Sequence, residues 1–303
     1  MDNLDIDQLS WDKFLKFSKK RGVLKKITEF NRLIFHSNNF FVVGGYGAFS
    51  PGYLLLISKD FIPSFGLIEK EKFKELNFLI KIAKKSISYE FKRSSAVFEH
   101  GMCACVGGLD RAHIHIMSLP KSTNASTLKK SIELTLFNRK SGVKYIEFKK
   151  FKLTNIHDIN QLYSEGLKKN SEYKVNGKIY KLEDIQNLNF EKWPFNTFKH
   201  IKKGNHYVYF KSDFKESSFL TTNNFQTQFG REVVYNNELM LNKKFKIECD
   251  KKLKENKFLD IWKWQNHKFE KNIYETIVHI GKALGNIQKE YKNEFHQYGI
   301  KII

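Results

Sequence analysis

Alternating and helical hydrophobic patterns divide the first 120 residues into five elements. β-rich runs at residues 40–43 and 52–58 flank the glycine-rich segment GGYGAFSPG, which predicts a turn or hairpin connection. A helix is predicted over 70–91, because apolar residues recur there at spacings of three and four (Leu76, Ile80, Ala83 and Ile87). Strands are predicted at 95–98 and 112–118. This order of elements predicts an α+β fold with an antiparallel sheet.

The second half of the chain carries fewer clear patterns. We expect a helix near 128–137 and strands at 144–148 and 206–210. The segment EYKVNGKIYKL predicts a tight hairpin, since Asn176-Gly177 suits the two positive-φ positions of its turn. A last helix is predicted by an apolar stripe: Ile273, Ile277, Ile280, Leu284, Ile287 and Tyr291. We favour packing of this stripe on the domain's own core, with a homodimer seam as the alternative.

Domain boundaries have to come from these elements, because the sequence offers no clear linker or repeat. It has four prolines and no Gly/Ser-rich tract. We divide it into a core at 1–125 and an extension at 126–303 that packs on the core as a lid, an acceptor site or a dimer element. At 303 residues and 41% hydrophobic composition, the chain can bury a substantial core.

The formal net charge of +21 changes this picture only in part. Lysine and arginine neutralise phosphates, so nucleic acid is one candidate partner. However, only six of the 53 basic residues are arginine, whose planar fork suits base readout, and the lysines are spread along the chain. We therefore favour a solvated, lysine-rich surface over a dedicated nucleic-acid face. Such a surface still attracts anions.

The chain shows no secretion or membrane signal. Its first residues, MDNLDIDQLSWDKF, are acidic and polar, and its apolar runs are too short to cross a bilayer. Three cysteines fit a reducing compartment better than a disulfide framework. We expect a cytoplasmic protein without a membrane partner.

Two histidines, His113 and His115, alternate with isoleucine after a glycine pair. Residues two apart in a strand point to the same side, so Arg111 and both histidines are expected on one face. Three interpretations compete: structural histidines, a metal site, and an anion site with a histidine nucleophile. The metal site would add His100, Cys103 and Cys105.

Arg111 favours the anion site, because a guanidinium repels a cation and complements a phosphate. Glycines at 101, 107 and 108 would let backbone N–H groups approach an oxyanion, so Gly101, Gly107 and Gly108 are candidate substrate-binding residues. Cys103 and Cys105 are expected to be small buried residues rather than ligands. We expect neither a metal nor a cofactor.

The segment FEHG, followed by a glycine-rich loop and GLDRAHIHIMSLP, resembles the active site of the histidine-triad (HIT) superfamily, whose pattern is His-φ-His-φ-His-φ-φ with φ apolar. Asp110 and Ala112 match, His113 takes the middle position and His115 the third. Arg111 stands where the first histidine is expected. A register with His115 in the middle and Met117 third loses the match to LDRAH, so we favour His113.

Further segments carry the resemblance, which covers residues 38–121. SPGYLLLISKDFIPSF resembles the family's early hairpin and brings in Lys59, with Tyr53 replacing a histidine. Counting back from Pro51 places Gly45 where some members carry an asparagine that holds the ribose. In the second half, Gln228-Phe-Gly-Arg231 and Trp262-Lys-Trp264 are weakly similar to the end of longer bacterial members.

The resemblance implies attack of His113 on an α-phosphorus to form a nucleotidyl-histidine. His115 and Arg111 would hold the non-bridging oxygens. Asp110, Gly45, Tyr53 and Lys59 are further substrate-binding candidates. Glu99 takes a place where members often carry an amide, and it is either a phosphate neighbour or a structural residue. Arg231 would be an additional phosphate clamp if the second half folds back over the site.

These expectations predict a nucleotide hydrolase or nucleotidyltransferase acting on a nucleotide or nucleotide conjugate. Retention of His115 favours hydrolysis, because members that transfer nucleotide to a sugar phosphate tend to carry glutamine there. Removal of an adenylate from a nucleic-acid 5' end is an alternative suggested by the charge. The other alternative is a non-catalytic nucleotide-binding regulatory module, in which Arg111 reflects loss of the catalytic triad.

Overall fold

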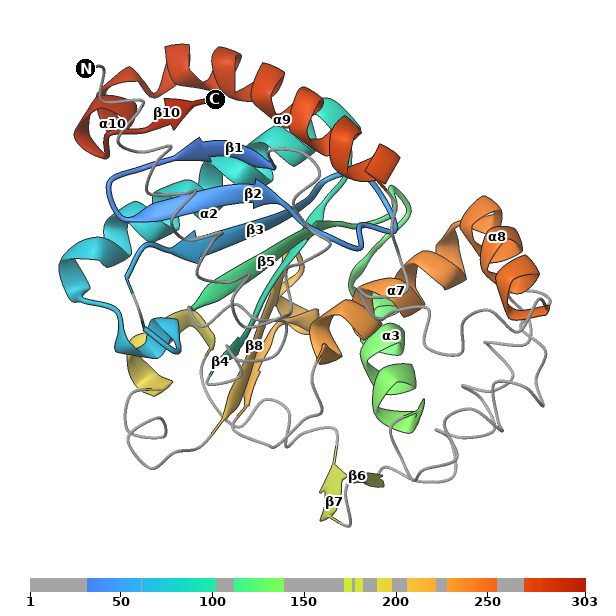
Figure 1. The fold of residues 1–303 in the computed structure, drawn as a ribbon. Helices are drawn as coiled ribbons and strands as arrows, with labels where there is room; N and C mark the ends of the chain where they lie inside the picture. Colours follow the sequence, from blue (N-terminus) through green and yellow to red (C-terminus); the bar gives the residue numbers. More distant parts are fainter. Residues whose placement is uncertain are drawn as a thin grey trace, which may run out of the picture.

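The structure is a computed structural model that describes residues 32–60, 62–101, 112–138, 172–175, 178–181, 190–197, 206–221, 228–254 and 270–303. Its main sheet has the strand order β10-β1-β2-β3-β5-β4-β8-β9 (Figure 1). All of its neighbouring strands pair antiparallel. Together with the helices around it, this sheet confirms the predicted α+β class.

The strands of the main sheet are β1 (Leu33–His36), β2 (Phe40–Gly44), β3 (Tyr53–Ser58), β4 (Ser95–Gly101), β5 (His113–Ser118), β8 (Tyr207–Ser212), β9 (Phe219–Thr221) and β10 (Lys301–Ile302). A separate hairpin is formed by β6 (Glu172–Val175) and β7 (Lys178–Lys181). The helices are α2 (Lys70–Phe91), α3 (Ala125–Asn138), α7 (Phe229–Leu241), α8 (Lys243–Lys254), α9 (Glu270–Glu290) and α10 (Lys292–Gln297).

Side-chain alternation gives the sheet two apolar faces. The α2 face carries Leu54 and Leu56 of β3 beside Ile114 and Ile116 of β5. The opposite face carries Tyr53, Leu55 and Ile57 of β3 beside Phe98 of β4 and Met117 of β5. We call it the histidine face, because His113 and His115 alternate with the buried isoleucines of β5 and so point to this side.

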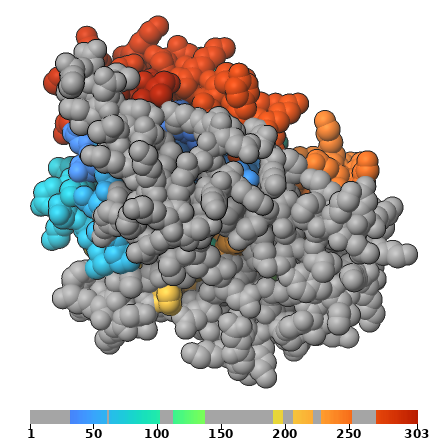
Figure 2. Space-filling view, viewed as in Figure 1, coloured from blue at the N-terminus to red at the C-terminus, as the bar shows by residue number. Residues whose placement is uncertain are grey.

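Two long helices cover the α2 face. Helix α2 buries Leu76, Leu79, Ile82, Ala83 and Ile87 against it. Helix α9 packs beside α2, where Ile280, Leu284 and Ile287 are at most 2% exposed. The predicted core packing of the last apolar stripe is confirmed for these residues. In Figure 2, the red surface along the upper edge of the molecule belongs to α9 and α10.

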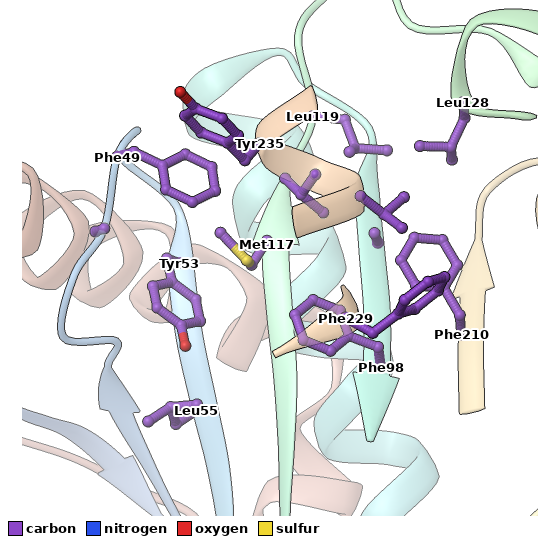
Figure 3. Close-up of a cluster of buried hydrophobic side chains, with 14 of the residues drawn as sticks. Phe49, Tyr53, Leu55, Phe98, Met117, Leu119, Leu128, Phe210, Phe229 and Tyr235 are labelled. Carbon is purple, nitrogen blue, oxygen red and sulfur yellow. The ribbon is translucent and has the colours of Figure 1, made fainter. Parts of the chain in front are cut away.

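Helices α3, α7 and α8 cover the histidine face. Figure 3 shows Phe229 and Tyr235 of α7 among Tyr53, Phe98 and Met117 of the sheet. Leu128 of α3 and Phe245 of α8 belong to the same cluster. The region assigned to the extension also pairs β8 with β4 and β10 with β1. It therefore completes the sheet as well as covering it.

Most predicted elements agree with the structure. The helix at 70–91, the strands at 40–43, 52–58, 112–118 and 206–210, and the 172–181 hairpin all match observed elements. Strand β4 extends three residues beyond the predicted 95–98. The predicted strand at 144–148 lies outside the described residues. No helix in the described part of the chain is long and apolar enough to span a membrane.

Candidate active site on the histidine face

The two alternating histidines lie side by side on β5, near the middle of the sheet. The ring centroids of His113 and His115 are 5.0 Å apart, with an interplanar angle of 63°. Both side chains are partly exposed, whereas Ile114 and Ile116 are 0% exposed on the α2 face. The predicted placement of both histidines on one side is confirmed.

The ring of His115 is held between two aromatic rings. Phe98 of β4 stacks on it at 4.6 Å between centroids and 7° between planes. The Tyr53 ring of β3 is 6.0 Å away and tilted by only 12°, and the Tyr53 hydroxyl lies 2.8 Å from His115 Nδ1. Strand pairing places both neighbours, since β5 lies between β3 and β4. The imidazole therefore has a fixed orientation.

The surroundings of His115 favour its neutral form. The pKa of His115 lies well below its usual 6.5, first because burial disfavours the charged form. Positive charge on His113, His100 and Arg231 lowers this pKa further. At neutral pH the imidazole is therefore uncharged, with one nitrogen protonated and the other bare.

Tyr53 connects His115 to two buried arginines. Arg231 of α7 places its guanidinium carbon 5.2 Å from the Tyr53 ring centroid, and its positive charge opposes the effect of burial on the pKa of Tyr53. Arg231 also donates to the Gly47 carbonyl at 2.8 Å. Arg32 donates to the Gly44 carbonyl at 2.6 Å, and burial lowers its pKa to about 10. Even at that value Arg32 stays charged at neutral pH.

Gly45 supports the Tyr53 ring. Its N–H donates to the Tyr53 carbonyl at 2.8 Å, and a Cβ added at Gly45 would overlap the Tyr53 ring. An asparagine at this position would displace Tyr53. The glycine and the tyrosine therefore fit each other, and the asparagine found here in some proteins that the sequence resembles has no counterpart at position 45.

His100 of β4, which the sequence indicates only as a possible metal ligand, also lies on the histidine face. Its ring lies 6.2 Å from Phe98, and its Nε2 accepts from the Gly230 N–H at 3.2 Å. Gly230 packs so closely on Phe98 that a Cβ there would overlap the ring. These contacts fix the start of α7, and the next residue is Arg231. Period-two alternation from Phe98 to His100 is the sequence signal that identifies this placement.

Glu99 and Gly101 point to the α2 face, away from the histidines. The Glu99 carboxylate is 1% exposed and accepts from the Tyr207 hydroxyl, from Trp193 Nε1 at 3.1 Å and from the Phe65 N–H at 2.8 Å. Burial raises its pKa to about 7, although these donors oppose the shift. A Cβ at Gly101 would overlap the Tyr207 ring. The structure gives both residues structural contacts and does not bring them to the histidines.

The remaining candidates are only partly described. Lys59 places its Nζ 4.9 Å from the Phe41 ring centroid, at the end of β3. The other candidates lie outside the described residues: Arg111, Gly107, Gly108, Asp110, Cys103 and Cys105. Within the described ranges, no group of three histidine, cysteine or acidic side chains is arranged to hold a metal.

No protein-family model matches the chain, and no curated protein matches it.

Proposed function

We propose that this protein cleaves or transfers a nucleotidyl group through a covalent intermediate on His113, as its resemblance to the HIT superfamily implies. The observation that carries the proposal is the His113–His115 pair on one face of the central strand, with ring centroids 5.0 Å apart. Such a pair offers one imidazole for attack and one for holding the phosphate, which is the minimum that a two-step displacement needs.

In the first step, a bare nitrogen of His113 forms a bond to the α-phosphorus. The bond between phosphorus and the leaving-group oxygen breaks, and the leaving group departs with the electron pair and takes up a proton. Water or an acceptor phosphate then attacks the phosphorus, and the phosphorus–nitrogen bond breaks to restore His113. His115 and Arg111 would hold the non-bridging oxygens during both steps.

The electrostatics of the histidine face support an anionic substrate. Arg231 and Arg32 are at most 7% exposed, and the positive charge of Arg231 acts on His115. A phosphate bound at the histidines would interact favourably with this charge. Because His115 is neutral, it can donate one hydrogen bond to a phosphate oxygen.

The sugar side of the site must differ from that of the family. Gly45 and Tyr53 replace the asparagine and the histidine of the early hairpin, and they pack against each other. Ribose recognition therefore depends on other residues. The proposed substrate class remains a nucleotide or nucleotide conjugate.

The test is product analysis on a panel of dinucleoside polyphosphates, nucleotide sugars and adenylated amines, with and without sugar phosphates as acceptors. Wild-type protein should release a nucleoside monophosphate or transfer it, and rapidly quenched protein should carry one nucleotidyl group on His113 that is labile in acid and stable in base. His113→Ala should abolish turnover and leave nucleotide binding within a few-fold. Tight binding without turnover in the wild type would favour the regulatory module, and activity that depends on His115 alone would assign the other register.

A further inference from the structure

Tyr53 occupies a place where three charged or titratable groups meet. Its hydroxyl is 2.8 Å from His115 Nδ1, and the guanidinium carbon of Arg231 lies 5.2 Å from the centroid of its ring. Arg32 lies close enough to interact with the same hydroxyl. Tyr53 is 2% exposed, and its ring packs directly against the backbone of Gly45. The hydroxyl is therefore held in place rather than free to rotate towards solvent.

The direction of the Tyr53–His115 hydrogen bond follows from the chemistry of the groups around it. A guanidinium has donors only, so Arg231 cannot accept the Tyr53 proton. Burial raises the pKa of Tyr53 above its usual 10, so the phenol keeps its own proton at neutral pH. The acceptor at hydrogen-bond distance for that proton is His115 Nδ1. A bare Nδ1 in a neutral imidazole requires a proton on Nε2.

We propose that Tyr53 and Arg231 are a positioning pair that holds His115 as its neutral Nε2–H tautomer, which makes His115 a phosphate-oxygen donor and not a nucleophile. The inference rests on the proposed function for the identity of the acceptor and deepens it by dividing the roles of the two histidines. A nitrogen that carries a proton has no lone pair for attack, and Nδ1 is engaged by Tyr53. Nucleophilic attack is thereby left to His113.

The same arrangement gives a function to Tyr53, which differs from the residue expected in the early hairpin. Tyr53 stands where the resemblance expects a histidine, and it pairs across the strands with Met117, two residues beyond His115 and on the same face. A phenol with a raised pKa keeps its proton over a wide pH range, whereas an imidazole titrates near neutrality. The state of His115 should therefore be insensitive to pH across the neutral range.

The other charged and titratable groups around His115 also favour its neutral form. His113 on β5, His100 on β4 and Arg231 on α7 all lower its pKa, and Arg32 acts on Tyr53 from the start of β1. Positive charge on any of them disfavours an imidazolium at His115. None of these groups supplies a negative charge that would favour protonation.

The tautomer can be read directly by nitrogen NMR of the histidine side chains in the full-length protein, with His115→Gln used for assignment. In the wild type, Nδ1 of His115 should show the shift of a bare nitrogen and Nε2 that of a protonated one, with no titration between about pH 6 and 8. Tyr53→Phe should give a mixture of tautomers or a His115 that titrates. Tyr235→Phe, which removes a buried hydroxyl elsewhere in the same cluster, should leave His115 unchanged.

A protonated Nδ1 in the wild type, or an unchanged tautomer in folded Tyr53→Phe, would overturn the proposal. If Tyr53→Phe does not fold, the wild-type spectrum alone decides. In turnover assays, Tyr53→Phe should lower kcat by roughly 10- to 100-fold with a smaller change in KM. The NMR result does not depend on activity, so it separates failure of this inference from failure of the proposed function.

Discussion

The ring of Phe98 lies parallel to the imidazole of His115, with their centroids 4.6 Å apart and their planes within 7°. Phe98 also stacks on Phe210 of β8, at 5.9 Å and 12°. The histidine is thus part of an aromatic stack that runs across four adjacent strands, from Tyr53 of β3 through His115 of β5 and Phe98 of β4 to Phe210 of β8. Packing of the core and orientation of the candidate catalytic residue are consequences of the same contact.

Phe98→Leu tests this relationship. The leucine keeps an apolar side chain but loses the stack, so we expect a loss of about 1 to 3 kcal/mol in the free energy of unfolding. The NMR signals of the His115 ring should also shift. Phe219→Leu is the matched control, because Phe219 stacks on the other side of Phe210 at 5.4 Å. It should lower stability similarly in urea unfolding and leave the His115 signals in place. Equal effects of both variants on His115 would contradict the prediction.

Glu99 predicts a pH dependence of stability. Its pKa is raised from 4.5 to about 7 in the folded protein, so between these values the folded state holds a proton that the unfolded chain has lost. The contribution of Glu99 to the free energy of unfolding is therefore fully present below about pH 4.5, and it is lost as the pH rises through about 7. The difference amounts to about 3 kcal/mol, at about 1.4 kcal/mol per pKa unit.

Urea unfolding of the wild type and Glu99→Gln between pH 4.5 and 8 checks this expectation. The glutamine variant should be less stable at low pH, because its NH₂ group faces donors from Tyr207 and Trp193. Its stability should fall less steeply with pH than that of the wild type. Parallel pH profiles would show that Glu99 is ionised throughout this range.

Because Gly45 packs against the Tyr53 ring, we expect substitutions at these two positions to have coupled effects on stability. Gly45→Asn alone introduces side-chain atoms where the Tyr53 ring lies, and we expect a loss of about 1 to 3 kcal/mol. Tyr53→His removes the phenol and leaves room, so the double variant Gly45→Asn/Tyr53→His should recover part of that loss. Thermal unfolding of the two single variants and the double variant gives the coupling energy. Strict additivity would mean that the two positions do not share space.

Arg111 predicts a graded series of activities. If its guanidinium holds a phosphate oxygen, Arg111→Ala should lower the rate by about 10²-fold with a smaller change in affinity. Lysine should restore little, since it lacks the planar fork. Histidine should restore part of the activity with a new pH dependence between about 6 and 7. Equal rates for all four proteins would remove Arg111 from the site.

Local patterns predicted the elements that carry the histidines, because alternation and helical spacing reflect burial on one side of an element. The antiparallel pairing of β5 agrees with the expected antiparallel sheet, and helix α2 lies where the apolar spacing over 70–91 predicts it. The sequence also contains the signal that places Glu99 on the α2 face. The predicted strand ends at Phe98, but the alternation continues to Gly101 and assigns Glu99 to the side opposite Phe98.

These local patterns do not predict contacts between segments that are distant in the sequence. The short strands β1, β9 and β10 have two to four residues each, too few for a period to be evident. The approach of Arg231 to Tyr53 depends on α7, which docks through Gly230 on Phe98 and His100. No local feature of the sequence around Arg231 encodes that partner. The clamp hypothesis placed Arg231 near the site, but its contact with Tyr53 emerged only from the fold.

The position of β8 has a consequence for synthesis of the protein. Strand β4 pairs on one side with β5 and on the other with β8, whose residues are made on the order of ten seconds after β4 at typical translation rates. Until then, a nascent chain exposes the hydrogen-bonding edge of β4 together with the apolar ring of Phe98. Such an edge is a target for pairing with other chains. Productive folding in the cell should therefore depend on chaperones that shield this strand during elongation.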